Sequence, residues 1–138
     1  MQKRKLVSRV QTNQSKFPIK KHTIVVADDD PAILEAMKLM LEFYDFEVKT
    51  IADGMVVSKL LSFKPTLLLL DICMPGVDGR EICKELKATA STKDIPVIMI
   101  SANYDIADAS RDSGADDYLA KPFEVQDLLK KINKYLLN

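Results

Sequence analysis

The chain has 138 residues, of which 47% are hydrophobic and 29% are charged, and its formal net charge is zero. This length and composition are typical of one soluble globular domain. The apolar stretches are shorter than the roughly 20 residues of a membrane span, and the basic N-terminus lacks the apolar core of a secretion signal. Cys73 and Cys83 are too few for a structural zinc site, so free thiols and a cytoplasmic location are expected.

The charges are unevenly distributed along the chain. Residues 1–22 contain seven basic residues and no acidic one, which leaves 13 basic and 20 acidic residues in 23–138, a net charge of −7. We expect residues 1–22 to be a flexible basic arm and residues 23–138 to be the folded domain. Such an arm could contact nucleic acid, an anionic membrane or the acidic domain, but it shows no periodicity and a disordered leader is the simpler interpretation.

Five short apolar runs predict β-strands in a sheet. The most informative run is Leu67–Leu70, because four consecutive leucines indicate a strand that is covered on both faces. It ends at Asp71, and Pro75-Gly76 then predict a turn. The expected strands span residues 23–27, 46–51, 67–70, 95–100 and 115–120.

Five helices are expected between and after these strands. Asp30 and Pro31 predict the start of the first, because Asp caps a helix and Pro suits the first helical position. The fourth has little apolar pattern, so we expect it to be short or irregular and to end at Gly114. The first helix is expected to start at residue 31, and the second, third, fourth and fifth are expected to span residues 53–63, 78–87, 105–113 and 125–136.

This alternation of strands and helices predicts the α/β class. Strands that alternate with helices form parallel sheets through right-handed crossovers, with helices on both faces. The expected fold is therefore a single domain with a flavodoxin-like, doubly wound, five-stranded parallel sheet and five helices.

Polar residues stand at the carboxyl ends of four predicted strands. Asp28 and Asp29 end the first, Asp71 the third, Ser101 the fourth and Lys121 the fifth. In a doubly wound sheet these ends converge on one crevice, where ligands bind. We therefore expect the five side chains to form one site.

The composition of this site predicts phosphoryl chemistry. Two unit charges about 4 Å apart repel by about 4 kcal/mol at an effective dielectric of 20, so three carboxylates need a cation. Mg²⁺ fits because it is a hard ion that prefers carboxylate, water and phosphate oxygens. Asp71 is a candidate nucleophile that would form an aspartyl phosphate. Mg²⁺, Lys121 and Ser101 would stabilise the charge on the transferring oxygens.

Over about residues 23–138, the chain resembles the receiver (CheY-like) domain of two-component response regulators. Four segments in the appropriate order and spacing carry the resemblance, and they are residues 25–31 (VVADDDP), 71–79 (DICMPGVDG), 100–102 (ISA) and 114–123 (GADDYLAKPF). The resemblance implies that Asp71 is the phosphoacceptor. It also implies that Asp29 binds Mg²⁺ directly, that Asp28 binds it mainly through water, and that the Cys73 carbonyl is a further ligand.

The resemblance also assigns a switch to the chain. Ser101 would swing toward the phosphoryl group, and Tyr118 would turn inward when Ser101 moves. Lys121 would contact the phosphoryl group, and the Lys121-Pro122 peptide would be cis. We further predict that Cys73 and Asn103, at the rim, tune the lifetime of the phosphoryl group.

The implied function is a phosphorylation-controlled binding switch in a phosphorelay. A sensor histidine kinase or histidine phosphotransfer protein would donate the phosphoryl group, and an output protein of unknown identity would sense the change. The only reaction implied is the domain's own phosphorylation and dephosphorylation, so it is not expected to be an enzyme otherwise. We expect no membrane partner and a monomer or weak dimer. The chain is either a stand-alone receiver or part of a longer protein.

One departure and two alternatives qualify this interpretation. The segment from Ser101 to Gly114 is about two residues shorter than in comparable family members, which places in doubt a dimer through the fourth helix, fifth strand and fifth helix.

Haloacid-dehalogenase-like phosphatases use a similar residue set, but their nucleophile precedes the acidic pair, whereas here it follows. A receiver-like module that no longer accepts phosphate is disfavoured by the complete Asp, Ser and Lys set. Asp116 and Asp117 are expected to be solvated.

Overall fold

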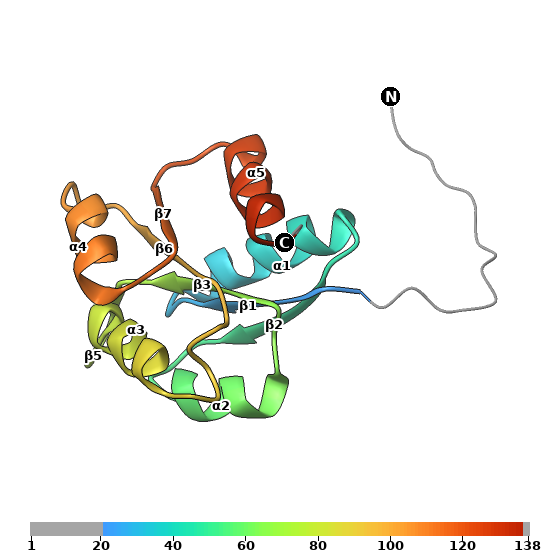
Figure 1. Ribbon diagram of the computed structural model, residues 1–138. Coiled ribbons are helices and arrows are strands. Elements are labelled where there is room, and N and C mark those ends of the chain that lie inside the picture. The colour runs from blue at the N-terminus through green and yellow to red at the C-terminus, as the bar shows by residue number, and fades with distance from the viewer. Residues whose placement is uncertain (1–20, 137–138) are drawn as a thin grey trace.

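The computed structural model describes residues 21–136, so residues 1–20 of the predicted arm lie outside the described residues. Five strands form one parallel sheet in the order β2-β1-β3-β6-β7 (Figure 1). Their bounds are β1 Thr23–Ala27, β2 Glu47–Ile51, β3 Leu67–Asp71, β6 Val97–Ser101 and β7 Asp117–Ala120. The predicted strands are all present, with starts and ends that differ by no more than two residues.

Five helices cover the two faces of this sheet. Helices α1 and α5 share one apolar cluster, whereas α2, α3 and α4 contribute to the other, and Figure 1 shows the two groups on opposite sides. Their bounds are α1 Pro31–Phe43, α2 Val56–Phe63, α3 Gly79–Ala88, α4 Ile106–Ser113 and α5 Val125–Leu136. The architecture is the flavodoxin-like doubly wound fold that the sequence predicts. No helix among residues 21–136 combines the length and apolar character needed to cross a membrane.

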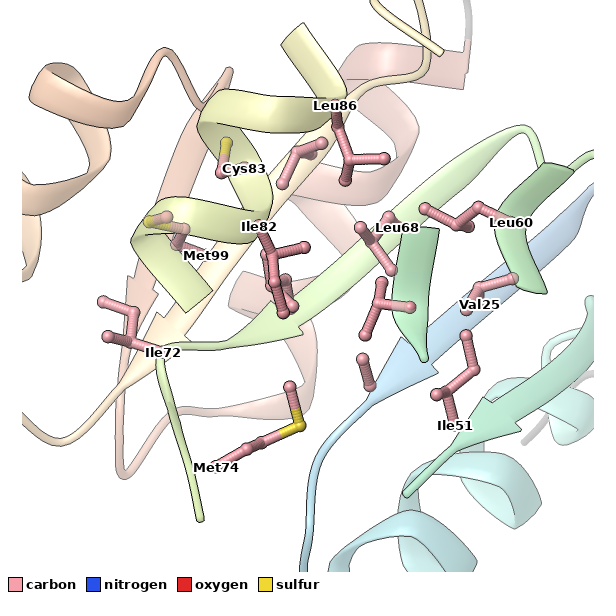
Figure 2. Packing of buried hydrophobic residues seen from close by; sticks show 14 of the residues in the cluster. Val25, Ile51, Leu60, Leu68, Ile72, Met74, Ile82, Cys83, Leu86 and Met99 are labelled. Carbon is pink, nitrogen blue, oxygen red and sulfur yellow. The ribbon is translucent and has the colours of Figure 1, made fainter. Parts of the chain in front are cut away.

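The leucine strand β3 lies at the centre of the sheet between β1 and β6. Leu67 and Leu69 face the α1/α5 side, and Leu68 and Leu70 face the other side, because side chains alternate along a strand. All four are fully buried. Figure 2 shows the second layer, in which side chains of α2 and α3 pack over the strands: Leu60, Ile82, Cys83 and Leu86. A central strand covered on both faces fixes the position of Asp71 at its end.

Helix α1 starts where the sequence predicts. The Asp30 carboxylate accepts hydrogen bonds from the backbone N–H groups of Ala32 and Ile33, at 2.9 and 3.4 Å, and Pro31 is the first helical residue. This cap satisfies two of the N–H groups that lack partners in the first turn of a helix. The cap therefore fixes the path of the chain directly after Asp28 and Asp29.

Helix α4 is short, as predicted, but it is regular over its eight residues. Its buried side contains small residues, including Ala109, Ser110 and Ser113, and the two serine hydroxyls find partners inside the fold. The Ser110 hydroxyl donates to the Asp117 carbonyl and the Ser113 hydroxyl donates to the Ser110 carbonyl, both at 3.2 Å. A weak apolar pattern is therefore compatible with a packed helix, which Gly114 ends at φ 84°.

A two-stranded hairpin after β3 was not predicted. Strands β4 (Cys73–Met74) and β5 (Val77–Asp78) pair antiparallel around a turn that contains Gly76 at φ 70°. The hairpin returns the chain to the end of β3, where the backbone N–H of Gly79 donates to the Ile72 carbonyl at 2.9 Å. A Cβ on Gly79 would lie 2.7 Å from the Asp71 carbonyl oxygen, so only glycine fits where α3 approaches the end of β3.

The start of β7 differs from the expectation that its two acids are solvated. The side chain of Asp117 is only 13% exposed, because Lys131 and Tyr135 of α5 lie across it. Lys131 Nζ donates to Asp117 Oδ1 at 2.9 Å, and the Tyr135 hydroxyl donates to Asp117 Oδ2 at 3.2 Å. Asp116 accepts from the backbone N–H of Val97 at 2.8 Å and from Lys87 at 2.7 Å. Both carboxylates therefore link elements of the fold.

Candidate functional site

The structure brings the predicted strand-end residues together at the carboxyl edge of the sheet. Asp28, Asp71 and Ser101 are buried, with 4%, 8% and 2% of their surface exposed, whereas Asp29 is exposed. The backbone N–H of Asp28 donates to the Ile51 carbonyl of β2 at 3.1 Å, which continues the sheet pairing into the site. Two acids are thus held out of water at the ends of neighbouring strands.

Lys121 is the cation that faces both buried acids. Its Nζ lies 3.2 Å from Asp28 Oδ2 and 3.8 Å from Asp71 Oδ2. Its backbone N–H donates to the Ser101 carbonyl at 2.9 Å, which ties it to β6, and its peptide bond to Pro122 is cis, as expected. One ammonium group therefore offsets two buried carboxylates in part.

The three acids could hold a metal ion together. Each of Asp28, Asp29 and Asp71 offers a carboxylate oxygen, and these oxygens all lie within 4.8 Å of one another. An all-oxygen donor set favours a hard cation such as Mg²⁺ over a soft one. The backbone N–H of Cys73 donates to Asp71 Oδ1 at 3.3 Å, which places the Cys73 peptide beside this cluster.

The electrostatics of the crevice act mainly on Asp71. Burial raises the pKa of its carboxyl above the ordinary value, while Lys121 lowers it, and the charge of Asp28 raises it further. The Cys73 N–H opposes the rise and Asp29 adds to it, and the balance is a raised pKa. The ionised form of Asp71 is therefore less favourable in the fold than in a free aspartate, and a cation bound beside it would favour that form.

The predicted rim residues also meet at this edge. Ser101 Oγ accepts from the backbone N–H of Asn103 at 3.0 Å, and the Asn103 amide lies 3.5 Å from Cys73 Sγ. An open groove beside the acids is lined by Asp29, Cys73 and Asn103 and reaches Arg80 of α3. A phosphoryl donor could approach Asp71 through this groove.

Tyr118 lies on β7 and is 38% exposed, so its side chain is at the surface of the domain in this structure. Its ring centroid is 5.4 Å from Lys131 Nζ of α5. Sequence reasoning missed both Lys131 and the role of Gly79. A glycine directly after a helix-capping Asp was the available signal for the close approach at Gly79, but no local pattern marks Lys131.

Fold and site together define a doubly wound α/β domain with a carboxylate and lysine crevice suited to phosphoryl transfer. The family model described as the response regulator receiver domain matches residues 24–133. The chain therefore belongs to the response regulator receiver family.

Individual relatives agree with this assignment. The chain is 40% identical over 116 residues to the DNA-binding dual master transcriptional regulator RpaA of Synechocystis, and 36% identical over 116 residues to the response regulator MprA of Mycobacterium avium. Each match covers 82% of this chain but only 48% and 50% of those two proteins. The chain thus spans about half the length of the curated relatives that it matches.

Solved structures match the fold over nearly their whole length. A CheY-like receiver domain protein from Methanospirillum hungatei superposes with a TM-score of 0.77 at 32% identity, over 85% of this chain and 94% of that one. The response regulator TrrA of Thermotoga maritima, solved in complex with Mg²⁺ and BeF, gives 0.75 at 32% identity, over 83% of this chain and 98% of that one.

Proposed function

We propose that this domain is a phosphorylation-controlled switch in which Asp71 accepts the phosphoryl group. The observation that carries the proposal is the position of Asp71, which is 8% exposed at the end of the central strand and faces Lys121 Nζ at 3.8 Å. A carboxylate in that position lies beside the open groove lined by Asp29, Cys73 and Asn103 and has a cation next to it. Both features suit attack on a phosphoryl group.

The donor is a sensor histidine kinase or a histidine phosphotransfer protein. A carboxylate oxygen of Asp71 forms a bond to phosphorus while the bond from phosphorus to the donor nitrogen breaks, and the imidazole leaves with the bonding electrons. Lys121 and the Ser101 hydroxyl, whose oxygen already accepts from Asn103 and whose proton can still be donated, bind the phosphoryl oxygens.

Asp28, Asp29 and Asp71 would hold Mg²⁺ together with the Cys73 carbonyl. When bound, the ion supplies positive charge that offsets the acids and the transferred oxygens. Asp28 Oδ1 accepts from the Asp30 N–H at 2.9 Å and Oδ2 faces Lys121, so both its oxygens already have partners. This supports contact with the ion through water for Asp28 and direct contact for the exposed Asp29.

The proposal includes a switch role for Ser101 and Tyr118 and a tuning role for Cys73 and Asn103. Ser101 moves toward the phosphoryl group and Tyr118 turns inward, which changes the surface near β7. Cys73 and Asn103 lie 3.5 Å apart at the groove and are placed to control the access of water to the phosphorylated site. We therefore assign their effect to the lifetime of the aspartyl phosphate.

The proposal extends to the setting in which the domain acts. Residues 23–138 form the receiver and residues 1–22 a basic arm, and an output protein senses the phosphorylated state. A cytoplasmic location suits the free thiols of Cys73 and Cys83. The domain works as a monomer or weak dimer and catalyses no reaction except its own phosphorylation and dephosphorylation.

Phosphorylation by acetyl phosphate with and without Mg²⁺ tests the proposal, with mass spectrometry of the intact protein as the readout. We expect Mg²⁺-dependent addition of one phosphoryl group to wild type and none to Asp71→Asn. Asp94→Asn, which removes an exposed acid remote from the crevice, is the matched control and should behave as wild type. A wild-type chain that stayed unmodified would instead support a receiver-like module that binds partners without phosphorylation.

A further inference from the structure

Tyr118 is contacted by a cation that the proposed switch does not use. Lys131 of α5 places its Nζ 5.4 Å from the centroid of the Tyr118 ring, within the range of a cation–π interaction. Tyr118 is 38% exposed, so the contact lies at the surface of the domain, between β7 and α5. Lys131 therefore interacts with the solvent-facing position of the ring and would lose that contact if the ring turned inward.

Lys131 is itself held in place by Asp117, the residue before Tyr118. Lys131 Nζ lies 2.9 Å from Asp117 Oδ1, and its side chain is 30% exposed against 13% for Asp117. Asp117 Oδ1 also accepts from the backbone N–H of Tyr118 at 2.8 Å, and Tyr135 lies 3.2 Å from Oδ2. These contacts orient the ammonium group over the ring.

Asp117 is a persistent anchor because it stays ionised. Burial acts to raise the pKa of its carboxyl, but the hydrogen bonds from Lys131, the Tyr118 N–H and Tyr135 prevail and lower it. The Asp117–Lys131–Tyr118 arrangement joins strand β7 to helix α5 through side chains that all have partners. It is thus a defined contact rather than a loose surface pair.

We propose that Lys131 is a positioning residue that holds Tyr118 in its solvent-facing rotamer in the unphosphorylated domain. The inference rests on the proposed function, in which the ring turns inward on activation. A contact made only in the resting state lowers the fraction of active conformer, and the apparent affinity for any activating ligand falls by the same factor. A surface cation–π contact corresponds to a factor of about two to five. Lys131 thereby sets the threshold of the switch.

Titration with beryllofluoride and Mg²⁺ tests this inference, with fluorine NMR of protein labelled with 3-fluorotyrosine as the readout. The Tyr118 resonance is assigned by its loss in Tyr118→Leu. In Lys131→Met, we expect the midpoint to fall about two- to fivefold and the resting resonance to shift toward its ligand-saturated position. Lys131→Arg should restore the wild-type midpoint, because a guanidinium also stacks on an aromatic ring.

Two controls separate the proposed contact from a general loss of charge on α5. Lys134 lies one turn along, with its Nζ 5.3 Å from the Tyr135 ring and 3.9 Å from Asp117, so Lys134→Met removes a matched cation that does not face Tyr118. It should leave the midpoint at the wild-type value. In a Tyr118→Leu background, where the resonance of Tyr104 beside Asn103 reports the midpoint, Lys131→Met should have no effect, because the ring that it contacts is gone.

The outcomes distinguish this inference from the proposed function. An unchanged midpoint in Lys131→Met, or a change that persists in the Tyr118→Leu background, would overturn the role of Lys131 while leaving phosphorylation intact. If wild type gave no response to beryllofluoride, the proposed function would fail. The only remaining test of the Lys131–Tyr118 contact would then be the Tyr118 resonance without ligand. If this resonance were the same in Lys131→Met as in wild type, the contact would be overturned as well.

Discussion

Two lysines at opposite edges of the sheet show how the molecule uses buried charge. At the amino edge, Lys87 Nζ donates to Asp116 at 2.7 Å, to the Ile95 carbonyl at 2.9 Å and to the Lys93 carbonyl at 3.2 Å. At the carboxyl edge, Lys121 lies 3.2 and 3.8 Å from two buried acids. One cation has a full set of acceptors, whereas the other is shared between carboxylates that outnumber it.

The difference separates a structural network from a functional one. Asp116 also accepts from the Val97 N–H at 2.8 Å, so the amino-edge network ties the start of β6 to α3 and is satisfied. The acids at the carboxyl edge carry excess negative charge, and burial together with the charges of Asp28 and Asp29 raises the pKa of Asp71 against the opposing effect of Lys121. A folded protein tolerates such an imbalance where a ligand is to be bound, at some cost in stability.

Lys121→Met should produce the largest effect, and it should act on the reaction. Loss of one positive group that contacts the transferring oxygens lowers rates by about 10²–10³-fold in comparable sites. We expect the rate of phosphorylation by acetyl phosphate to fall by a similar factor. Mg²⁺ should bind more tightly, because the variant lacks the ammonium group that competes for Asp28 and Asp71. Rate measurements and Mg²⁺ titrations check the two opposite changes, and weaker Mg²⁺ binding would contradict this account.

Lys87→Met should show the reverse pattern, with a loss of stability and little effect on chemistry. The substitution leaves the Lys93 and Ile95 carbonyl groups without the Lys87 donor and leaves Asp116 with only the Val97 N–H, which costs about 1–3 kcal/mol of unfolding free energy. The phosphorylation rate of the folded protein should stay at the wild-type value. Urea unfolding gives the first quantity, and acetyl phosphate kinetics the second.

Lys84→Met is the matched control on the same helix. Lys84 is 54% exposed and pairs with Glu81 at 3.3 Å, so its removal should change stability by less than about 0.5 kcal/mol. Equal effects of the two substitutions would show that the Lys87 network adds nothing beyond a surface ion pair.

The two edges also differ in how much of their structure could be predicted from the sequence. The arrangement of the crevice could be predicted because Asp28, Asp71, Ser101 and Lys121 each end a recognisable strand, and parallel strands bring their carboxyl ends together. The amino-edge and β7 contacts could not, because they depend on where long side chains such as Lys87 reach. Asp117 was expected to be solvated for this reason, since nothing local indicates that α5 crosses it.

Other differences have equally local causes. The β4–β5 hairpin consists of two-residue strands, which are too short for a period to be visible. Helix α4 turns alanine and serine toward the sheet, so its apolar pattern is weak although its packing is not. The central strand β3 was the most predictable element, because four consecutive leucines directly predict burial on both of its faces.

Asp71→Asn should have a smaller effect than Lys121→Met or Lys87→Met, and it should make the protein more stable. Burial raises the pKa of Asp71, so the folded protein retains this proton at pH values where the unfolded chain has lost it. Wild-type stability therefore falls as pH rises through the range from the ordinary value near 3.8 to the raised one. Removing the charge should add about 0.5–2 kcal/mol at neutral pH without Mg²⁺, and the gain should vanish as pH falls below that range.

Asp78→Asn supplies a control of opposite sign for the Asp71→Asn experiment. Hydrogen bonds from Arg80 lower the pKa of Asp78 despite some burial, so this carboxylate contributes stability above its unfolded pKa and loses that contribution as pH falls through the lowered one. Because its side chain is 39% exposed, the loss in Asp78→Asn should stay below about 1 kcal/mol. Saturating Mg²⁺ should reverse the order of wild type and Asp71→Asn, since the ion stabilises only the form that binds it well. If thermal unfolding showed Asp71→Asn to be no more stable than wild type without Mg²⁺, the carboxyl edge would not be electrostatically crowded, and the contrast between the two lysines would be lost.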